Sequence, residues 1–258
     1  MQVEYFKSAS RHLGRDMEAK RYGHAGRPLI MWPTSNGRFF QYEDTGTVQS
    51  IGQFIDRGEV QVFTLDGLDW ETFTDRDGDP VARIDRHEAF FRYVREEALP
   101  SFTEMARASN GGAELKPILS GCSMGAFHSA NFTFRFPELA AGLIALSGVY
   151  SASDFFGGSL DGRIFYNSPV HYLAGLEDAT LLGRIRAQRL IFCVGRGAHE
   201  GPMIADTHEL ESVLASKGIP AWVDFWGEAA SHDWPWWHKQ LPYFLKHWLD
   251  ADREQAVA

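Results

Sequence analysis

Cysteine, long apolar runs and clusters of basic residues are all scarce in this sequence of 258 residues. Its two cysteines, Cys122 and Cys193, are too few for a disulfide framework, and no spacing of ligands indicates zinc. No apolar stretch reaches the roughly 18 residues that a membrane-spanning helix needs. The first twenty residues carry charges throughout and lack the apolar segment of a secretory signal. These absences make a cytoplasmic location the expectation.

The charge balance limits the kinds of partner. A net charge of −9 disfavours nucleic acids and anionic membranes, because both bind basic surfaces. Hydrophobic residues make up 44% and charged residues 23% of the chain, which is ordinary for a globular protein. The length suits a single domain over residues 1–258 of the α/β class, and a homodimer is compatible with the sequence.

Strand-like and helix-like patterns alternate along the chain. Two antiparallel edge strands are expected within residues 2–22. Further strands are expected at 28–32, 60–65, 117–120, 143–147, 190–194 and 221–226, and helices at 48–57, 83–99, 125–135, 206–217 and 238–249. This order predicts a mostly parallel central sheet with helices on both faces. Residues 148–175, rich in glycine, serine and aromatics, are expected to form a small cap of loops and short helices.

One pentapeptide lies where a strand should turn into a helix. Gly121-Cys122-Ser123-Met124-Gly125 follows the apolar run 117–120 and precedes the helical pattern 125–135. Glycines on both sides of a serine allow the tight turn that exposes its hydroxyl as a nucleophile. The motif alone is also compatible with an ordinary turn. Its strand–turn–helix setting favours Ser123 as the nucleophile.

A serine nucleophile needs a base, and the base needs a group that orients it. His232 follows the last expected strand and precedes the last helix, where enzymes with this chain order carry their base. The acid should follow the strand at 190–194. Glu200 is favoured by its position in the loop after that strand, while Asp206 is the alternative and also has a structural interpretation as a helix N-cap.

Backbone N–H groups must stabilise the oxyanion that forms during acyl transfer. Met124, directly after the nucleophile, should supply one. Ser35 or Asn36, in the loop after the strand at 28–32, should supply the other, unless this loop is only a polar turn. Trp234 is a candidate wall of the substrate pocket, with core packing as the alternative.

Several histidine and acidic side chains near these motifs are expected to have structural and not functional roles. His128 and His199 are interpreted as solvated or hydrogen-bonded histidines. The acidic residues of the segment from Asp66 to Asp79 are interpreted as a polar turn, because the spacing lacks the late glutamate of a calcium loop.

The sequence resembles the esterase D-like branch of the α/β-hydrolases, which includes S-formylglutathione hydrolases and mycolyltransferases, and most closely a group of small bacterial esterase-like proteins. The resemblance covers nearly the whole chain. It rests on Trp32–Gly37, Gly121–Gly125, Phe165–Pro169, Val194–Glu200 and His232–Trp237.

The resemblance implies the α/β-hydrolase fold, Ser123 as nucleophile, His232 as base and Met124 as an oxyanion donor. Glu200 matches the glutamate that closes a Gly-x-Gly loop in the mycolyltransferases, whereas esterase D proper has an aspartate closer to the strand. The loop Thr34–Gly37 lacks the cysteine of the thioesterase branch, which argues against glutathione thioesters as substrates.

These residues predict a serine carboxylesterase that hydrolyses a small or medium ester through an acyl-enzyme, without a metal or an organic cofactor. An acyltransferase with the same triad is the first alternative, because only the acceptor differs. A non-catalytic binding module is the second, because a fold does not fix a function.

Overall fold

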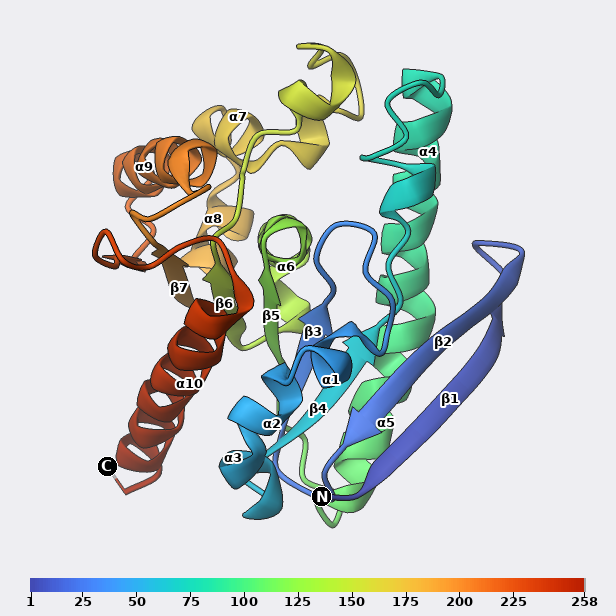
Figure 1. The fold of residues 1–258 in the computed structure, drawn as a ribbon, viewed down its shortest axis with the longest axis vertical. Coiled ribbons are helices and arrows are strands. Elements are labelled where there is room, and N and C mark those ends of the chain that lie inside the picture. Colours follow the sequence, from blue (N-terminus) through green and yellow to red (C-terminus); the bar gives the residue numbers. More distant parts are fainter. Residues whose placement is uncertain (258) are drawn as a thin grey trace.

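The computed structural model describes residues 1–257, and its centre is one eight-stranded sheet in the order β1-β2-β4-β3-β5-β6-β7-β8 (Figure 1). The strands are β1 Val3–Ser10, β2 Arg15–Tyr22, β3 Arg27–Trp32, β4 Val60–Leu65, β5 Ile118–Cys122, β6 Gly142–Leu146, β7 Arg189–Val194 and β8 Trp222–Phe225. The β1–β2 and β2–β4 pairs are antiparallel, and all later pairs are parallel. The predicted α/β class and its two antiparallel edge strands are confirmed.

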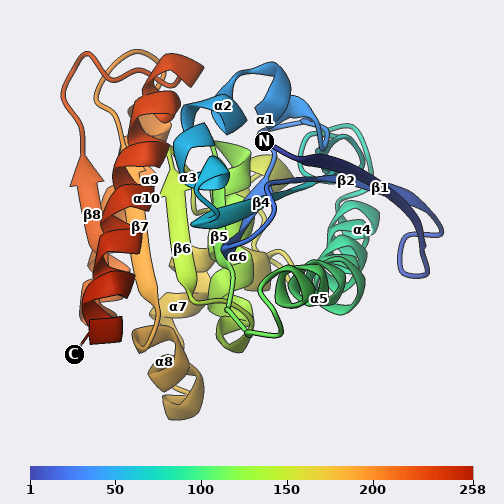
Figure 2. The same cartoon turned by 90° about the horizontal axis from the view of Figure 1, so that it is seen from below.

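Helices cover both faces of the sheet (Figure 2). They are α1 Gln41–Asp44, α2 Thr47–Ser50, α3 Gly52–Asp56, α4 Pro80–Tyr93, α5 Leu99–Ser109, α6 Met124–Arg135, α7 Pro169–Ala174, α8 Ala179–Arg186, α9 Gly201–Ser216 and α10 Trp234–Val257. Along β5 and β6, Leu119 and Leu143 pack into the core beneath α4–α9, while Ile118 and Ile144 pack against α1–α3 and α10. Successive strand side chains point to opposite faces, so both faces of these strands are apolar, as in a sheet covered on both sides.

Four helix predictions differ from the structure. The helix expected at 48–57 is two short helices, α2 and α3. The helix expected at 83–99 begins at Pro80 and continues through a π-helical turn, Val94–Ala98, into α5. Pro100 cannot donate to the carbonyl of Glu96, and the π turn accommodates this missing bond. The last two helices, α9 and α10, begin four to five residues earlier than expected, at Gly201 and Trp234.

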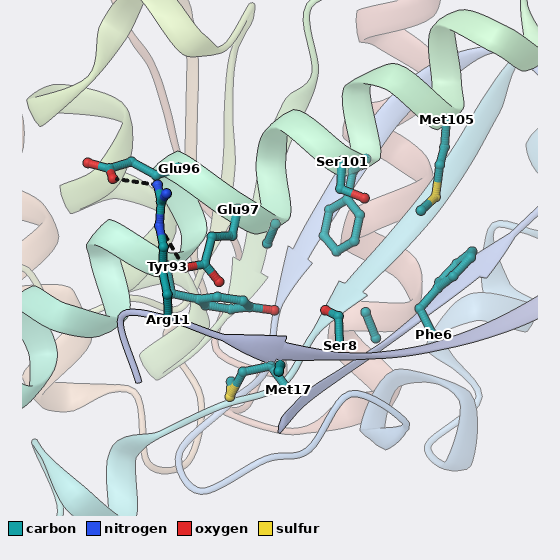
Figure 3. Close-up of a pocket in the computed structure, with 13 residues that line it drawn as sticks. Phe6, Ser8, Arg11, Met17, Tyr93, Glu96, Glu97, Ser101 and Met105 are labelled. Carbon is teal, nitrogen blue, oxygen red and sulfur yellow. Dashed lines mark hydrogen bonds and ion pairs between the residues drawn. The ribbon is translucent and has the colours of Figure 1, made fainter. Parts of the chain in front are cut away.

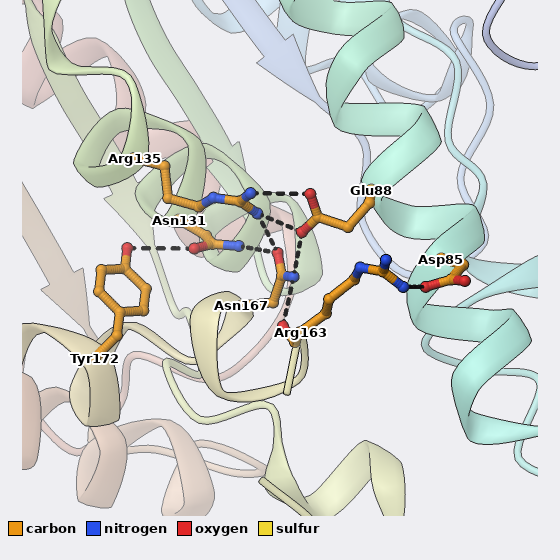
Figure 4. A network of polar contacts seen from close by, with 7 residues as sticks. All are labelled: Asp85, Glu88, Asn131, Arg135, Arg163, Asn167 and Tyr172. Atoms are coloured by element: carbon orange, nitrogen blue, oxygen red, sulfur yellow. Dashed lines mark hydrogen bonds and ion pairs between the residues drawn. The ribbon is translucent and has the colours of Figure 1, made fainter. Parts of the chain in front are cut away.

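The segment predicted as a cap, residues 148–175, contains α7 and two 3₁₀ turns, and a polar network fastens it to α4 and α6 (Figure 4). Arg135 of α6 donates to both carboxylate oxygens of Glu88 on α4, at 2.7 and 2.9 Å. Asn167 of the cap accepts from Arg135 at 2.7 Å and donates to Glu88 at 2.6 Å. Arg163 forms an outer ion pair with Asp85. The segment is therefore anchored to two helices of the main body.

Within residues 1–257, no helix combines the length and the apolar character that crossing a membrane requires.

Candidate active site

The turn between β5 and α6 holds Ser123 in a strained conformation. Its φ of 54° and ψ of −122° lie outside the regions that residues other than glycine favour. A Cβ on Gly121 would overlap the backbone of Gly125, and a Cβ on Gly125 would overlap the carbonyl oxygen of Trp32. Both glycines are therefore needed, because backbone segments approach each other too closely at this end of the sheet to leave room for a side chain.

Ser123, His232 and Glu200 are joined by hydrogen bonds, although they come from three distant segments. The Nε2 atom of His232 lies 2.9 Å from the hydroxyl oxygen of Ser123. On the other side of the ring, Nδ1 lies 3.3 Å from Oε2 of Glu200. His232 follows β8, and Glu200 ends the loop after β7. Parallel strands deliver these loops to one edge of the sheet, which brings together a hydroxyl, an imidazole and a carboxylate.

The two loops that carry the acid and the base are in contact through their backbones. The N–H of His232 donates to the carbonyl of Ala198 at 3.0 Å. A Cβ on Gly195 would overlap the carbonyl oxygen of Ala230, which leaves no room for a side chain. The glycines of Val194–Glu200 therefore allow close packing of these loops, which sets the distance between Glu200 and His232.

Ser147 holds the carboxylate of Glu200 directly, and Trp237 supports it through Ser147. The sequence did not reveal either role. Glu200 is fully buried, and its Oε1 accepts the hydroxyl proton of Ser147 at 2.7 Å. The indole N–H of Trp237 donates to the same hydroxyl at 3.0 Å, and its ring contacts the His232 ring edge-on, with centroids 5.0 Å apart. Ser147 has a φ of 53° at the end of β6, a strain that a sequence pattern does not show.

Asp206, the alternative acid, serves a different part of the chain. It lies inside α9 and not at its N-cap, because the helix already begins at Gly201. Its carboxylate accepts the N–H groups of Tyr150 and Ser151 at 2.5 and 3.0 Å. Burial raises the pKa of the Asp206 carboxyl, while these two hydrogen bonds lower it. The N-cap interpretation of Asp206 is wrong. The hydrogen bonds of its carboxylate hold the start of the cap segment instead.

The loop after β3 offers one of the two oxyanion donors that the sequence predicted as alternatives, Ser35 and Asn36. The N–H of Thr34 donates to Oε1 of Gln41 at 3.0 Å, and that of Asn36 donates to Oδ2 of Asp69 at 3.4 Å. The N–H groups of Ser35 and Met124 have no acceptor within residues 1–257. Asn36, one of the two expected donors, is thus directed to a carboxylate, which leaves Ser35 as the candidate donor from this loop.

Cys122 and Trp234 flank the nucleophile and the base. Cys122 is buried, and burial raises the pKa of its thiol, so the neighbouring cysteine stays a neutral thiol. Trp234 is half-buried at the start of α10 and meets the rings of Tyr42 and Trp237 edge-on, with centroids 5.9 and 4.9 Å apart. Its contacts fit core packing on one side and leave part of the indole exposed.

Tyr42 ties together the two strands that end at the nucleophile turn, a role that the sequence did not reveal. Its hydroxyl donates to the carbonyl of Trp32 on β3 at 2.7 Å. The same oxygen accepts the N–H of Cys122 on β5 at 3.0 Å. The Tyr42 side chain is 1% exposed, so water cannot replace either bond.

The Tyr42→Phe variant should lower the free energy of unfolding by about 2–4 kcal/mol, since it leaves a buried carbonyl and a buried N–H unpaired. Urea denaturation measures this change. Tyr22→Phe is the control, because Tyr22 donates to Glu43, a carboxylate that is 32% exposed. Its cost should stay below about 1 kcal/mol. Equal losses for the two variants would contradict the bridging role.

A cavity of about 360 Å³ lies away from these residues, between the β1–β2 hairpin and the helical rod of α4 and α5 (Figure 3). It has an apolar end at Phe6 and Met105 and a charged end at Arg11 and Glu96. None of the predicted site residues lines it. Among the described residues, no group of three or more histidine, cysteine or acidic side chains is placed to hold a metal ion.

The mixed sheet, the strained serine turn and the helices on both faces define the α/β-hydrolase fold. Solved structures of this fold match almost the whole chain. A ferulic acid esterase has a TM-score of 0.73 at 16% identity, over 94% of this chain and 95% of its own. An S-formylglutathione hydrolase from Agrobacterium tumefaciens has a TM-score of 0.70 at 14% identity, over 96% and 94%. MPT51 of Mycobacterium tuberculosis has a TM-score of 0.71 at 14% identity, over 97% and 99%.

No protein-family model matches the sequence, and no curated protein sequence matches it either. The structural likeness includes the kinds of protein that the sequence resemblance indicated, and it confirms the fold. At these identities the reaction has to be inferred from the residues of this chain.

Proposed function

We propose that this protein is a serine carboxylesterase. The observation that carries the proposal is the continuous hydrogen-bond chain from the Ser123 hydroxyl through His232 to the buried carboxylate of Glu200. A serine hydroxyl is a weak nucleophile until a base in hydrogen-bond reach removes its proton. The strained turn adds support, because it presents this hydroxyl at the start of α6, where backbone N–H groups attract negative charge.

In the first step, the Ser123 oxygen bonds to the ester carbonyl carbon while His232 Nε2 takes the hydroxyl proton. Glu200 orients the imidazole through Nδ1 and stabilises its charged form. The N–H groups of Met124 and Ser35 stabilise the negative oxygen of the tetrahedral intermediate. The carbon–oxygen bond to the alcohol then breaks, and the alcohol leaves with the proton from His232.

The second step repeats this chemistry with water. His232 removes a proton from water, the hydroxide oxygen bonds to the acyl carbon, and the bond to Ser123 breaks. Ser123 recovers its proton from His232, and the carboxylic acid leaves. No step calls for a metal or an organic cofactor. A cytoplasmic location and a homodimer remain predictions from the sequence.

The substrate is proposed to be a small or medium ester. The cap segment is fastened to α4 and α6 through Asn167, and we propose that this limits the room for a long acyl chain. The exposed part of Trp234 is proposed to wall the pocket beside His232. The name of one structural relative, a ferulic acid esterase, fits an ester of moderate size.

Rates with p-nitrophenyl acetate, butyrate, octanoate and palmitate test this proposal. We expect kcat/KM to be greatest for acetate or butyrate, and a fluorophosphonate probe to inactivate the enzyme with one adduct per chain. A maximum of kcat/KM with palmitate would overturn the proposal that the substrate is a small or medium ester. An unlabelled protein without activity on any ester would overturn the esterase itself and leave a binding module.

The acyltransferase alternative is tested in the same assay by adding an alcohol acceptor. The hydrolase proposal expects the free carboxylic acid as the main product, because water reaches the acyl-enzyme. A new ester as the main product at a low concentration of alcohol would favour transfer.

A further inference from the structure

A buried carboxylate–imidazole pair, Asp69 and His128, lies beneath the loop that follows β3. Each residue is 3% exposed, and His128 Nε2 lies 2.8 Å from Asp69 Oδ1. The sequence predicts a polar turn around Asp69 and a solvated or hydrogen-bonded histidine at His128, and the hydrogen-bonded alternative is the one found for His128. Asp69 does begin a turn, a 3₁₀ turn shortly after β4, but its side chain is buried, which the sequence did not predict. A buried polar pair outside the triad calls for a physical explanation, because burying polar side chains is costly unless they are hydrogen-bonded.

The second oxygen of Asp69 reaches the oxyanion loop. Oδ2 accepts the backbone N–H of Asn36 at 3.4 Å. The side chain of Asn36 is held as well, because its Oδ1 accepts the hydroxyl proton of Thr74 at 2.7 Å. Asn36 has a φ of 57°, a left-handed conformation that asparagine tolerates better than most residues. These contacts turn the Asn36 N–H inward, and Ser35 is then the neighbouring residue whose N–H has no acceptor within residues 1–257.

His128, the second residue of the pair, lies on the helix that follows the nucleophile. His128 lies on α6, one turn after Met124, whose N–H is the first proposed oxyanion donor. Aromatic rings of Trp32, Phe73 and Phe127 enclose the His128 ring, with centroids 5.3 to 6.1 Å away. The helix is rigid over this distance, so a fixed His128 fixes the direction of the Met124 N–H.

We propose that Asp69 and His128 are positioning residues that set the spacing between the two oxyanion donors. His128 holds the helix that carries Met124, and Asp69 bonds both to His128 and to the loop that carries Ser35. The inference rests on the proposed esterase function and adds to it the residues that align the oxyanion site. It predicts that Asp69 acts on kcat, because donors aimed at the oxyanion contribute chiefly in the transition state.

The Asp69→Ala variant tests this. Active sites are counted by fluorophosphonate titration, so misfolded protein does not enter the rate. We expect kcat per titrated site with p-nitrophenyl acetate to fall about 10- to 100-fold, since a donor displaced by about 1 Å costs roughly that much. KM should stay within about twofold. The conservative variant Asp69→Asn keeps an acceptor for Asn36 and a hydrogen-bonding partner for His128, and should recover most of the loss.

Asp66→Ala is the matched control. Asp66 is also a buried aspartate beneath the same loop. Its carboxylate accepts hydrogen bonds from the backbone N–H of Phe39 at 3.3 Å and from the guanidinium Nε–H of Arg38 at 2.6 Å. These contacts lie beyond the donor residues, so kcat per titrated site should stay within about threefold of wild type. An Asp66→Ala loss as large as that of Asp69→Ala would show a general effect on the loop and overturn the inference.

Thr74→Val provides a second test that does not depend on the folding of a core variant. Thr74 donates to Asn36 from a position near the surface, so its loss should leave the melting temperature unchanged. We expect kcat per titrated site to fall about threefold or more, because the Asn36 turn is held less firmly. Wild-type kcat in both Asp69→Ala and Thr74→Val would overturn the inference while leaving the esterase intact. An inactive, unlabelled wild type would instead overturn both.

Discussion

The Ser123→Ala variant should hydrolyse p-nitrophenyl acetate at least about 10⁴-fold more slowly than wild type and should carry no fluorophosphonate adduct. The reason is chemical, because alanine offers no oxygen to form the acyl-enzyme while the oxyanion donors and His232 stay in place. Among the described residues, the serine hydroxyl is hydrogen-bonded to His232 alone, so the fold should survive its removal. Steady-state kinetics and mass spectrometry of the labelled protein measure the two effects.

Ser120→Ala is the control for this result. Ser120 is a buried serine on β5, the strand that leads into the Ser123 turn, and its hydroxyl donates to the carbonyl of Ile144 at 2.8 Å. Its replacement should cost about 1 kcal/mol of stability and leave the activity per folded molecule within about twofold. Residual labelling of Ser123→Ala at the wild-type rate would place the nucleophile elsewhere.

The Glu200→Gln variant should lose about 10⁴-fold in kcat, because the amide imposes the wrong tautomer on His232. The surrounding contacts dictate how the amide turns. Trp237 donates to Ser147, which leaves the Ser147 hydroxyl proton directed at residue 200. A glutamine oxygen would accept that proton, so its NH₂ would face His232 Nδ1. Nδ1 would then have to accept, and Nε2 would carry the proton and could not act as the base.

Asp206→Asn is the comparison that separates the two candidate acids. The amide oxygen of asparagine can still accept the N–H groups of Tyr150 and Ser151, so kcat should stay within about threefold of wild type. A larger loss in Asp206→Asn than in Glu200→Gln would reverse the assignment.

The elements that the sequence predicted well are those with strong local patterns. The strand at 60–65 has the predicted bounds because it is an apolar run, and the edge pair within residues 2–22 forms as expected around the turn at Gly14. Helix starts were less accurate. Gly201 and Pro202 begin α9, yet no side-chain cap marks this start, since Glu200 directs its carboxylate to His232 and not to the helix.

The side chains that support the site were harder to predict because they come from separate parts of the chain. Ser147, Trp237 and Tyr42 look like ordinary strand or helix residues in the sequence. Their roles depend on hydrogen bonds across 53, 90 and 80 positions of the chain, to Glu200, to Ser147 and to Cys122 respectively. The burial of Asp69 was missed for the same reason, since its hydrogen bond to His128 joins residues 59 positions apart.

The sequence by itself determined the class of fold, the serine turn with its two glycines, and the order of serine, acid and histidine along the chain. Hydrophobic periodicity along the chain encodes the class of fold, and local backbone geometry encodes the serine turn, so that neither depends on how distant segments meet. The tertiary structure alone decided that Glu200 and not Asp206 lies beside His232, and that Asn36 turns its N–H to Asp69. Those outcomes depend on how loops from different strands meet at one edge of the sheet, and burial then leaves each polar group with one set of partners.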